Sequence, residues 1–463
     1  MNKNCLILIL SGHEVRQFSH SGMIRQLLEK GFQIVVAARI VDEDLIDQFD
    51  PRVKFIPLIK IPLSPALHRI QKLLDRTYQI KESKLGKNKW IDQWKNQKIS
   101  LKGKINSFFL GILSRIVISN ENLYKRLIQY EKNLELRYVS QDWLKLLRDW
   151  NIGSIITNTP RSEILQPVLI AGKYLDIPRF LFYHSIKDIA GKSRLVHDFS
   201  SIGVWNNWMM DEVIRQNQSV INSEKVKVSG CAHFDCVGRD DLLIPEEIFR
   251  KKIGANPSSR LLMYPAAVHY VIPDQGRYID MIINAVMNGN LPEDIQIVIR
   301  TNPMDLSDYF EKKFLDNPFV IIQKANWRME SQGGWNFQRY EDMLMFNSLL
   351  HYSSLCFGIP STVTIECAIS CLPVLNIGFD LVDPAPPQSM KVFWKAEFYQ
   401  EVVRHGVAEL CEDEKELIKK INYALNTKKS GYESYKNFLS EFFGVLPPYS
   451  SKKYIEIIET VNP

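Results

Sequence analysis

The chain has 463 residues, 45% of them hydrophobic, with 58 basic and 52 acidic side chains. This composition excludes a largely disordered or fibrous protein, and at roughly 150 residues per domain the length suggests two or three domains. The seven cysteines form no Cys-x-x-Cys pair, and an odd count argues against a disulfide framework. No apolar run approaches the roughly 20 residues of a spanning helix, and the first residues lack the order of a signal peptide. The sequence therefore predicts a cytoplasmic protein.

The N-terminal part alternates between expected strands and helices. Residues 5–10 form a continuous apolar run, which is typical of a parallel strand covered on both faces. A polar loop follows at 11–22, then a helix that begins at Met23 and ends before Gly31, then a strand at 33–37. This order predicts a right-handed crossover and a parallel sheet. Later strands are expected at 154–157, 179–182 and 226–228, with a helix at 163–175.

The stretch from 66 to 150 breaks this alternation, because it has few strand signals and long helical periodicity. We expect a helical insertion in the first domain. Residues 81–104 contain eight lysines and two acids, and an apolar helix follows at 105–118. This composition is that of an interfacial membrane helix, so the region 81–118 is a candidate for binding an anionic surface on the inner face of the membrane. A helical hairpin with its lysines in water is the alternative that we favour, because such helices are so common.

A second series of strands and helices begins after residue 240. Ligands of doubly wound sheets bind at the carboxyl ends of the strands, so two such domains in tandem predict a site in the cleft between them. The sequence thus predicts an α/β protein with a Rossmann-like domain at 1–235, a second at 236–430, and a helical tail at 431–463 that packs back on the first domain. Strands of the second domain are expected at 260–264, 295–300, 320–322, 355–357 and 373–377, with helices at 275–286, 306–314, 340–351, 361–370 and 412–425.

The most informative segment runs from Cys356 to Asp380. A strand ends there, a turn follows, and Ser361 and Thr362 open a helix. The N–H groups and the positive dipole end of a helix start attract phosphate, and the two hydroxyls add donors. Glu366 lies one turn later on the same helical face, where a carboxylate can accept both hydroxyls of a ribose. A Ser/Thr cap followed by a solvated glutamate is the ordinary alternative, and the motif alone leaves both open.

Two further segments accompany this one. Together with Val228-Ser-Gly-Cys-Ala-His-Phe-Asp235 and Ile299-Arg-Thr-Asn-Pro-Met-Asp305, the Cys356–Asp380 segment resembles the GT-B superfamily of nucleotide-sugar glycosyltransferases. The sequence looks most like the bacterial surface-polysaccharide branch. That branch shares its C-terminal domain with nucleotide-sugar 2-epimerases and with glycerophosphotransferases of teichoic acid synthesis. The resemblance covers roughly 226–425 and extends to the N-terminal domain only in architecture.

The resemblance implies a metal-independent GT-B enzyme that moves a sugar from a nucleotide-sugar donor to a glycan or lipid-linked acceptor, with no cofactor beyond this co-substrate. Ser361 and Thr362 would contact the diphosphate, and Glu366 would accept the hydroxyls of the ribose. Arg300 would point into the cleft and help to meet the charge of the leaving diphosphate. Asn302 stands where the family often has histidine, which weakens the transfer of a 2-epimerase or glycerophosphotransferase mechanism. Those two activities remain alternatives, as does a non-catalytic scaffold of a polysaccharide assembly complex.

The loop after the first strand carries the candidate bases. Histidine suits a general base because its unperturbed pKa is about 6.5. We place His13 ahead of His20 because it lies nearest the strand end, and Glu14 is the competing base. Each histidine is more often a packing residue than a base. The other candidates are Arg16, Arg161 and His184 for the acceptor or the cleft, and Trp335, which could stack on the nucleotide base or pack beneath its loop.

The remaining motifs indicate structural roles. Asp42-Glu-Asp44 matches the DxD of metal-dependent glycosyltransferases, but it opens a helix and is interpreted as a cap. Gly230 and Asp235 are expected to form a tight turn and a capping carboxylate. No G-x-G-x-x-G or P-loop is present, and no nucleic-acid-binding module is recognisable. The pairs Cys231/Cys236 and Cys367/Cys371 have no histidines at zinc spacing and are interpreted as buried thiols.

Overall fold

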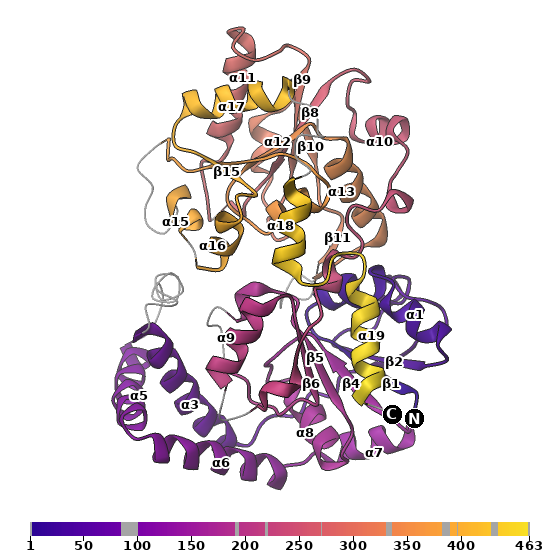
Figure 1. The fold of residues 1–463 in the computed structure, drawn as a ribbon, viewed down its shortest axis with the longest axis vertical. Helices are drawn as coiled ribbons and strands as arrows, with labels where there is room; N and C mark the ends of the chain where they lie inside the picture. The colour runs from indigo at the N-terminus through magenta and orange to yellow at the C-terminus, as the bar shows by residue number, and fades with distance from the viewer. Residues whose placement is uncertain are drawn as a thin grey trace. The chain divides into compact units, whose positions relative to one another are not determined.

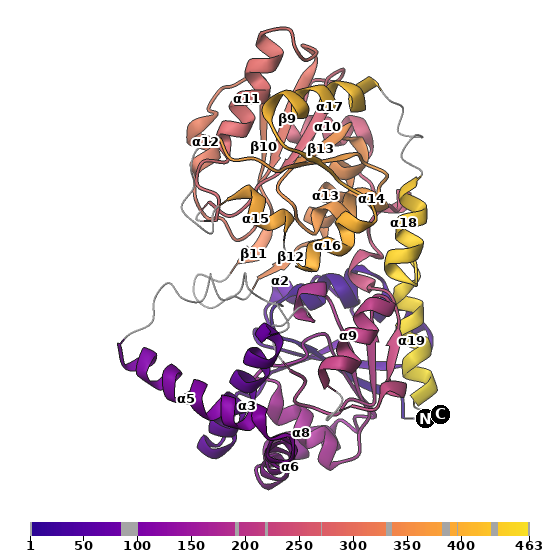
Figure 2. The same ribbon diagram turned by 60° about the vertical axis from the view of Figure 1, so that its left-hand side comes forward.

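The structure is a computed structural model and consists of two compact units, each built on one parallel sheet covered by helices (Figures 1 and 2). Unit 1 comprises Met1–Asp235, Met329–Phe337 and Phe443–Pro463, and unit 2 comprises Cys236–Arg328 and Gln338–Phe442. The predicted α/β architecture with two doubly wound sheets is confirmed. The structure describes residues 2–84, 101–189, 194–217, 221–269, 271–329, 336–381, 389–395, 397–426 and 434–461.

The sheet of unit 1 has seven parallel strands in the order β3-β2-β1-β4-β5-β6-β7. The chain leaves β1 toward β2 on one side and later returns to pair β4 on the other. A topological switch point therefore lies between β1 and β4. The sequence did not predict β3 or β6. The strands are β1 (Asn4–Ile9), β2 (Gln33–Ala38), β3 (Lys54–Pro57), β4 (Ser154–Thr157), β5 (Arg179–Phe182), β6 (Ser201–Val204) and β7 (Val226–Val228).

The C-terminal helix α19 (Ser450–Val461) completes the core of unit 1. The Tyr454 ring stacks on Phe182 with centroids 3.9 Å apart. Asp235 caps this helix by accepting the backbone N–H groups of Ser450 and Ser451 at 3.3 and 2.6 Å. Gly230 has φ +69°, and a Cβ there would lie 2.5 Å from the Ser450 hydroxyl oxygen. The expected structural roles of Gly230 and Asp235 are confirmed.

Four further helices cover the unit 1 sheet. The N-cap of α2 is Asp42, whose carboxylate accepts the Leu45 N–H at 2.9 Å, so the capping interpretation of the DxD motif is confirmed. These helices are α1 (Met23–Glu29), α2 (Glu43–Ile46), α8 (Gln166–Tyr174) and α9 (Asn207–Asn217).

Among its described residues, the insertion between β3 and β4 contains helices joined by short turns and no strand, as expected. Most of the lysine-rich run falls at 85–100, outside the described residues. The facing sides of α3 and α6 bury a small apolar cluster that includes Leu67, Leu74 and Ile128. The helices are α3 (Pro65–Lys84), α5 (Leu101–Ser119), α6 (Glu121–Arg137) and α7 (Gln141–Asp149).

The sheet of unit 2 has six parallel strands in the order β10-β9-β8-β13-β14-β15, with its switch point between β8 and β13. The strands are β8 (Arg260–Pro265), β9 (Ile295–Arg300), β10 (Val320–Gln323), β13 (Leu355–Gly358), β14 (Val374–Ile377) and β15 (Glu409–Cys411). A separate two-stranded sheet pairs β11 (Trp327–Met329) with β12 (Asn336–Gln338). The helices are α10 (Glu246–Ile253), α11 (Gly276–Met287), α12 (Tyr309–Lys313), α13 (Tyr340–Tyr352), α14 (Val363–Ile369), α15 (Met390–Trp394), α16 (Glu397–Arg404), α17 (Glu414–Asn426) and α18 (Ser434–Phe443).

Candidate functional site

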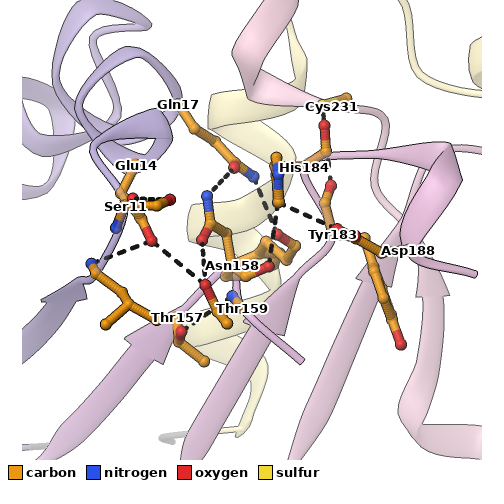
Figure 3. A network of polar contacts seen from close by, with 12 residues as sticks. Ser11, Glu14, Gln17, Thr157, Asn158, Thr159, Tyr183, His184, Asp188 and Cys231 are labelled. Atoms are coloured by element: carbon orange, nitrogen blue, oxygen red, sulfur yellow. Dashed lines mark hydrogen bonds and ion pairs between the residues drawn. The ribbon is translucent and has the colours of Figure 1, made fainter. Parts of the chain in front are cut away.

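The candidate site of unit 1 lies where β1, β4 and β5 end, because these three strands are neighbours in the sheet and parallel. The loops that follow them carry Ser11 to Glu14, Asn158 and Thr159, and Tyr183 and His184 (Figure 3). Ligands of open α/β sheets bind at this edge beside the switch point. The sequence-predicted His13, Glu14 and His184 all come from these loops.

The segment after β1 is not the polar loop that the sequence suggested. Residues Val15–His20 form a π-helix, and the Ser21 N–H donates to the Arg16 carbonyl at 3.1 Å, one residue further back than in an α-helix. Val15 and Phe18 are fully buried in the unit 1 core, which fixes this wider turn. Single π-helical turns are rare and are frequent at functional sites.

Glu14 organises this loop. Its carboxylate is fully buried and accepts the backbone N–H groups of Leu10, Ser11 and Gly12 at 3.2, 3.2 and 2.8 Å (Figure 3). The Ser11 and Thr159 hydroxyls add two more hydrogen bonds, at 3.2 and 3.3 Å. These contacts join the end of β1 to the end of β4. Since the carboxylate is already engaged, Glu14 is better placed to hold the loop than to act as the competing base.

His184 has the geometry of an oriented imidazole. Its Nδ1 lies 3.5 Å from the Asn158 carbonyl oxygen and 3.4 Å from the Asp188 carboxylate (Figure 3). A carbonyl oxygen can only accept, so we place the proton on Nδ1, which leaves Nε2 as the acceptor of the neutral ring. The His13 ring stacks on His184 with centroids 5.5 Å apart and planes 16° apart. The structure thus brings together two residues predicted from separate loops.

Two more histidines and Arg16 lie near this pair. Burial lowers the pKa of His20 to about 4, so its neutral ring is a weak proton acceptor and it is a poor candidate base. Burial, followed by the positive charge of Arg16, lowers the pKa of His233 well below its usual value. His233 was not predicted as a site residue, although it follows β7 in the segment Val228–Asp235 that carried the resemblance.

Gln17 and Asn158 hold the loops in place and were missed by the sequence analysis. The Asn158 side-chain amide donates to the Gln17 side-chain oxygen at 2.8 Å. The Gln17 amide in turn donates to the Phe182 carbonyl and to the Tyr454 hydroxyl, both at 3.1 Å. The only signal for Asn158 was its position directly after β4.

Arg161 is held by the insertion. Its guanidinium is paired with Asp75 of α3, which also accepts a hydrogen bond from Arg194 at 3.2 Å. Only 17% of the Arg161 side chain is exposed. We therefore assign Arg161 to the attachment of the insertion rather than to the acceptor.

Arg300, the predicted strand-end cation of unit 2, is also engaged within its own unit. It donates to the Asp342 carboxylate at 2.6 Å, and only 7% of its side chain is exposed. Burial alone would raise the pKa of Asp342, but the Arg300 charge and several hydrogen bonds outweigh it and lower the pKa. The pair orders the start of α13, so we interpret Arg300 as structural rather than as a diphosphate contact.

The predicted donor residues lie beside the switch point of unit 2. Thr362 is the N-cap of α14, which follows β13. Glu366 is only 6% exposed, so the solvated-glutamate alternative is wrong. Thr364, in the first turn of α14, is held by a 2.8 Å hydrogen bond between its hydroxyl and that of Tyr399. Trp335 lies outside the described residues.

The described part of the chain contains no group of three histidine, cysteine or acidic side chains placed to hold a metal ion. Cys231, Cys236 and Cys367 are buried as expected, whereas Cys371 is only half-buried. Burial raises the pKa of Cys231 and of Cys367 well above the usual value, so both stay protonated thiols near neutral pH.

No known family model and no curated protein matches the chain. Its structure is similar to UDP-GlcNAc 2-epimerase from Methanocaldococcus jannaschii, with TM-score 0.55, 12% identity, and 99% of each chain covered. UDP-GlcNAc 2-epimerase from Neisseria meningitidis, solved with bound UDP-GlcNAc, matches with TM-score 0.54 and 12% identity over 99% of this chain and 100% of that one. A glycosyltransferase from Rickettsia africae matches with TM-score 0.53 and 11% identity over 100% and 99%. The chain has the GT-B fold. At these identities the likeness is one of fold and carries no residue-level role.

Proposed function

We propose that the protein is a glycosyltransferase that moves a sugar from a nucleotide-sugar donor to a glycan or lipid-linked acceptor in bacterial surface polysaccharide synthesis. One observation carries the proposal: an imidazole, His184, is oriented through Nδ1 at the carboxyl end of the unit 1 sheet, where it is stacked on His13. An acceptor hydroxyl needs such a base to become a nucleophile.

Unit 2 would bind the donor. Its predicted residues Ser361 and Thr362 lie between β13 and α14, beside the switch point of that sheet, which is where ligands of open α/β sheets bind. Their hydroxyls are suited to a diphosphate, and the carboxylate of Glu366 is suited to the two hydroxyls of a ribose. The fold likeness to a protein solved with UDP-GlcNAc makes uridine diphosphate sugars the first donors to test.

The proposed reaction begins when the acceptor hydroxyl gives its proton to His184 Nε2. The acceptor oxygen bonds to the anomeric carbon, the bond from that carbon to the diphosphate oxygen breaks, and the nucleoside diphosphate leaves with the electron pair. The Asp188 carboxylate, 3.4 Å from Nδ1, stabilises the imidazolium that forms. Glu14 and Gln17 act only by holding the loops that carry these groups.

The function is tested by incubating the protein with a panel of nucleotide sugars, with and without glycan and lipid-linked acceptors, and identifying the products by mass spectrometry. We expect nucleoside diphosphate and a glycosylated acceptor, both only when the acceptor is present. A free or nucleotide-bound sugar epimer formed without acceptor would instead identify a 2-epimerase. Binding of nucleotide with no turnover across the panel would favour the scaffold alternative.

The donor site is tested by replacing Glu366. We expect Glu366→Ala to weaken nucleotide-sugar binding by about 10- to 100-fold, the equivalent of losing a hydrogen-bonded charged group. Titration of the thermal unfolding midpoint with nucleotide sugar measures this, because a ligand that binds only the folded state raises that midpoint. Glu366→Gln keeps the buried shape and controls for misfolding, and Glu247→Ala on the exposed side of α10 is the matched control. If both Glu366 variants titrate like the unmodified protein, the donor site lies elsewhere.

A further inference from the structure

One side of the insertion helix α5 is apolar and exposed. Phe108, Phe109, Ile112, Leu113 and Ile116 are each between 39% and 66% exposed. Residues three and four apart share a face of a helix, so these five side chains form one continuous stripe, referred to below as the α5 face. Large apolar side chains gathered in this way mark an interaction site more often than single exposed ones do.

The opposite side of α5 is packed within unit 1, which fixes the direction of the α5 face. Ser114 and Val117 are buried, and Val117 and Ile118 line a pocket with Tyr78 of α3 and Tyr124 of α6. Both ribbon views place α5 on the outer side of α3 (Figures 1 and 2). The α5 face is therefore the side of α5 that points away from the rest of unit 1.

The sequence around the α5 face carries charge of one sign. From 93 to 120 there are five basic residues and no acid, and two of these lysines belong to α5 itself. An apolar helix that follows a lysine-rich segment in the sequence is suited to a surface that offers both hydrocarbon and negative charge. A second copy of the chain would bring the same positive stretch, so a symmetric pair through this face would be opposed by like charges. The five basic residues are Lys95, Lys98, Lys102, Lys104 and Arg115.

We propose that the α5 face binds the surface of an anionic lipid bilayer, with α5 lying in the interface and its apolar side chains entering the boundary of the hydrocarbon. No described helix is long and apolar enough to span a membrane, so we propose that α5 lies on the bilayer surface. The proposal does not depend on the transfer reaction, and its test reads binding alone.

The proposal is tested by sedimenting the full chain with vesicles of phosphatidylglycerol and phosphatidylcholine, and with vesicles of phosphatidylcholine alone. We expect binding to the anionic vesicles that weakens between about 0.1 M and 1 M salt, because the Debye length falls from about 10 Å to 3 Å. Changing Phe108, Phe109, Ile112 and Ile116 to serine should lower the partition coefficient at least about tenfold. The matched control changes Met287, Leu306 and Leu315, which are exposed in unit 2, to serine and should bind as the unmodified protein does.

Three outcomes overturn the proposal. The unmodified protein could stay in the supernatant with anionic vesicles, the unit 2 control could lose as much binding as the α5 variant, or both vesicle types could bind the protein equally. Circular dichroism and thermal unfolding of each variant show whether it is folded. Analytical ultracentrifugation separates the remaining alternative: a dimer that the α5 serines abolish, without vesicle binding, would make the face a contact between two copies.

Discussion

Replacing His184 with glutamine should lower kcat for sugar transfer by about 100- to 10,000-fold, the range that a positioned general base contributes. Glutamine fills a similar space and still forms hydrogen bonds, but it cannot take the proton of the acceptor hydroxyl. Because His184 belongs to unit 1 and the predicted donor residues belong to unit 2, KM for the donor should change little. Release of nucleoside diphosphate, followed at saturating donor and acceptor, measures the effect.

Matched variants separate this role from a structural one. His68→Gln removes a partly exposed imidazole of α3 that pairs with Glu163, and should leave kcat unchanged. Asp188→Asn should lower kcat less than H184Q does, at unchanged KM, because the amide still fits beside Nδ1 but carries no charge to stabilise the imidazolium. Unchanged kcat in a folded H184Q variant would contradict the assignment. His13, stacked on the same ring, would then be the base to test.

Most of the fold could be predicted because the central strands can be recognised from the residues within each strand alone. The strands β4, β5, β7 and β9 have the expected bounds, since each is a short segment rich in β-branched or aromatic residues. β6 was missed because Ser201-Ile-Gly-Val204 contains a glycine, a residue that is depleted in strands. The segment forms a strand because it pairs with β5 and β7. The absence of a side chain at Gly203 leaves room for the Phe182 ring, which would lie 2.4 Å from a Cβ at that position.

The candidate site was only partly predictable, for a different reason. The meeting of His13 with His184 follows from strand order, because β1, β4 and β5 are adjacent and their loops share one edge. The engagement of Glu14 by three backbone amides depends on the local path of a π-helical loop that no periodicity reveals. The partner of Arg300 is Asp342, 42 residues away, and neither residue indicates the other in the sequence.

The attachment of the insertion depends on a buried ion pair that the sequence also did not reveal. Arg194 and Glu131 of α6 are each 2% exposed and share hydrogen bonds of 2.6 and 2.9 Å. Burial alone would lower the pKa of Arg194, but the charge of Glu131 outweighs it and raises the pKa. Each charge is therefore tolerated only because the other is present.

Arg194→Met should accordingly lower the free energy of unfolding by about 3–5 kcal/mol, because it leaves the Glu131 carboxylate buried without its partner. Asp75 would remain paired with Arg161, so the loss of stability should come mainly from the unpaired Glu131 carboxylate. Adding Glu131→Leu should restore much of the loss, since an apolar pair of similar volume is often as stable as a buried ion pair. Urea unfolding followed by circular dichroism measures both variants. Lys125→Met, which removes an exposed pair with Glu121 on α6, should cost less than about 1 kcal/mol. A double variant less stable than R194M would show that the pair is not what holds α6 in place.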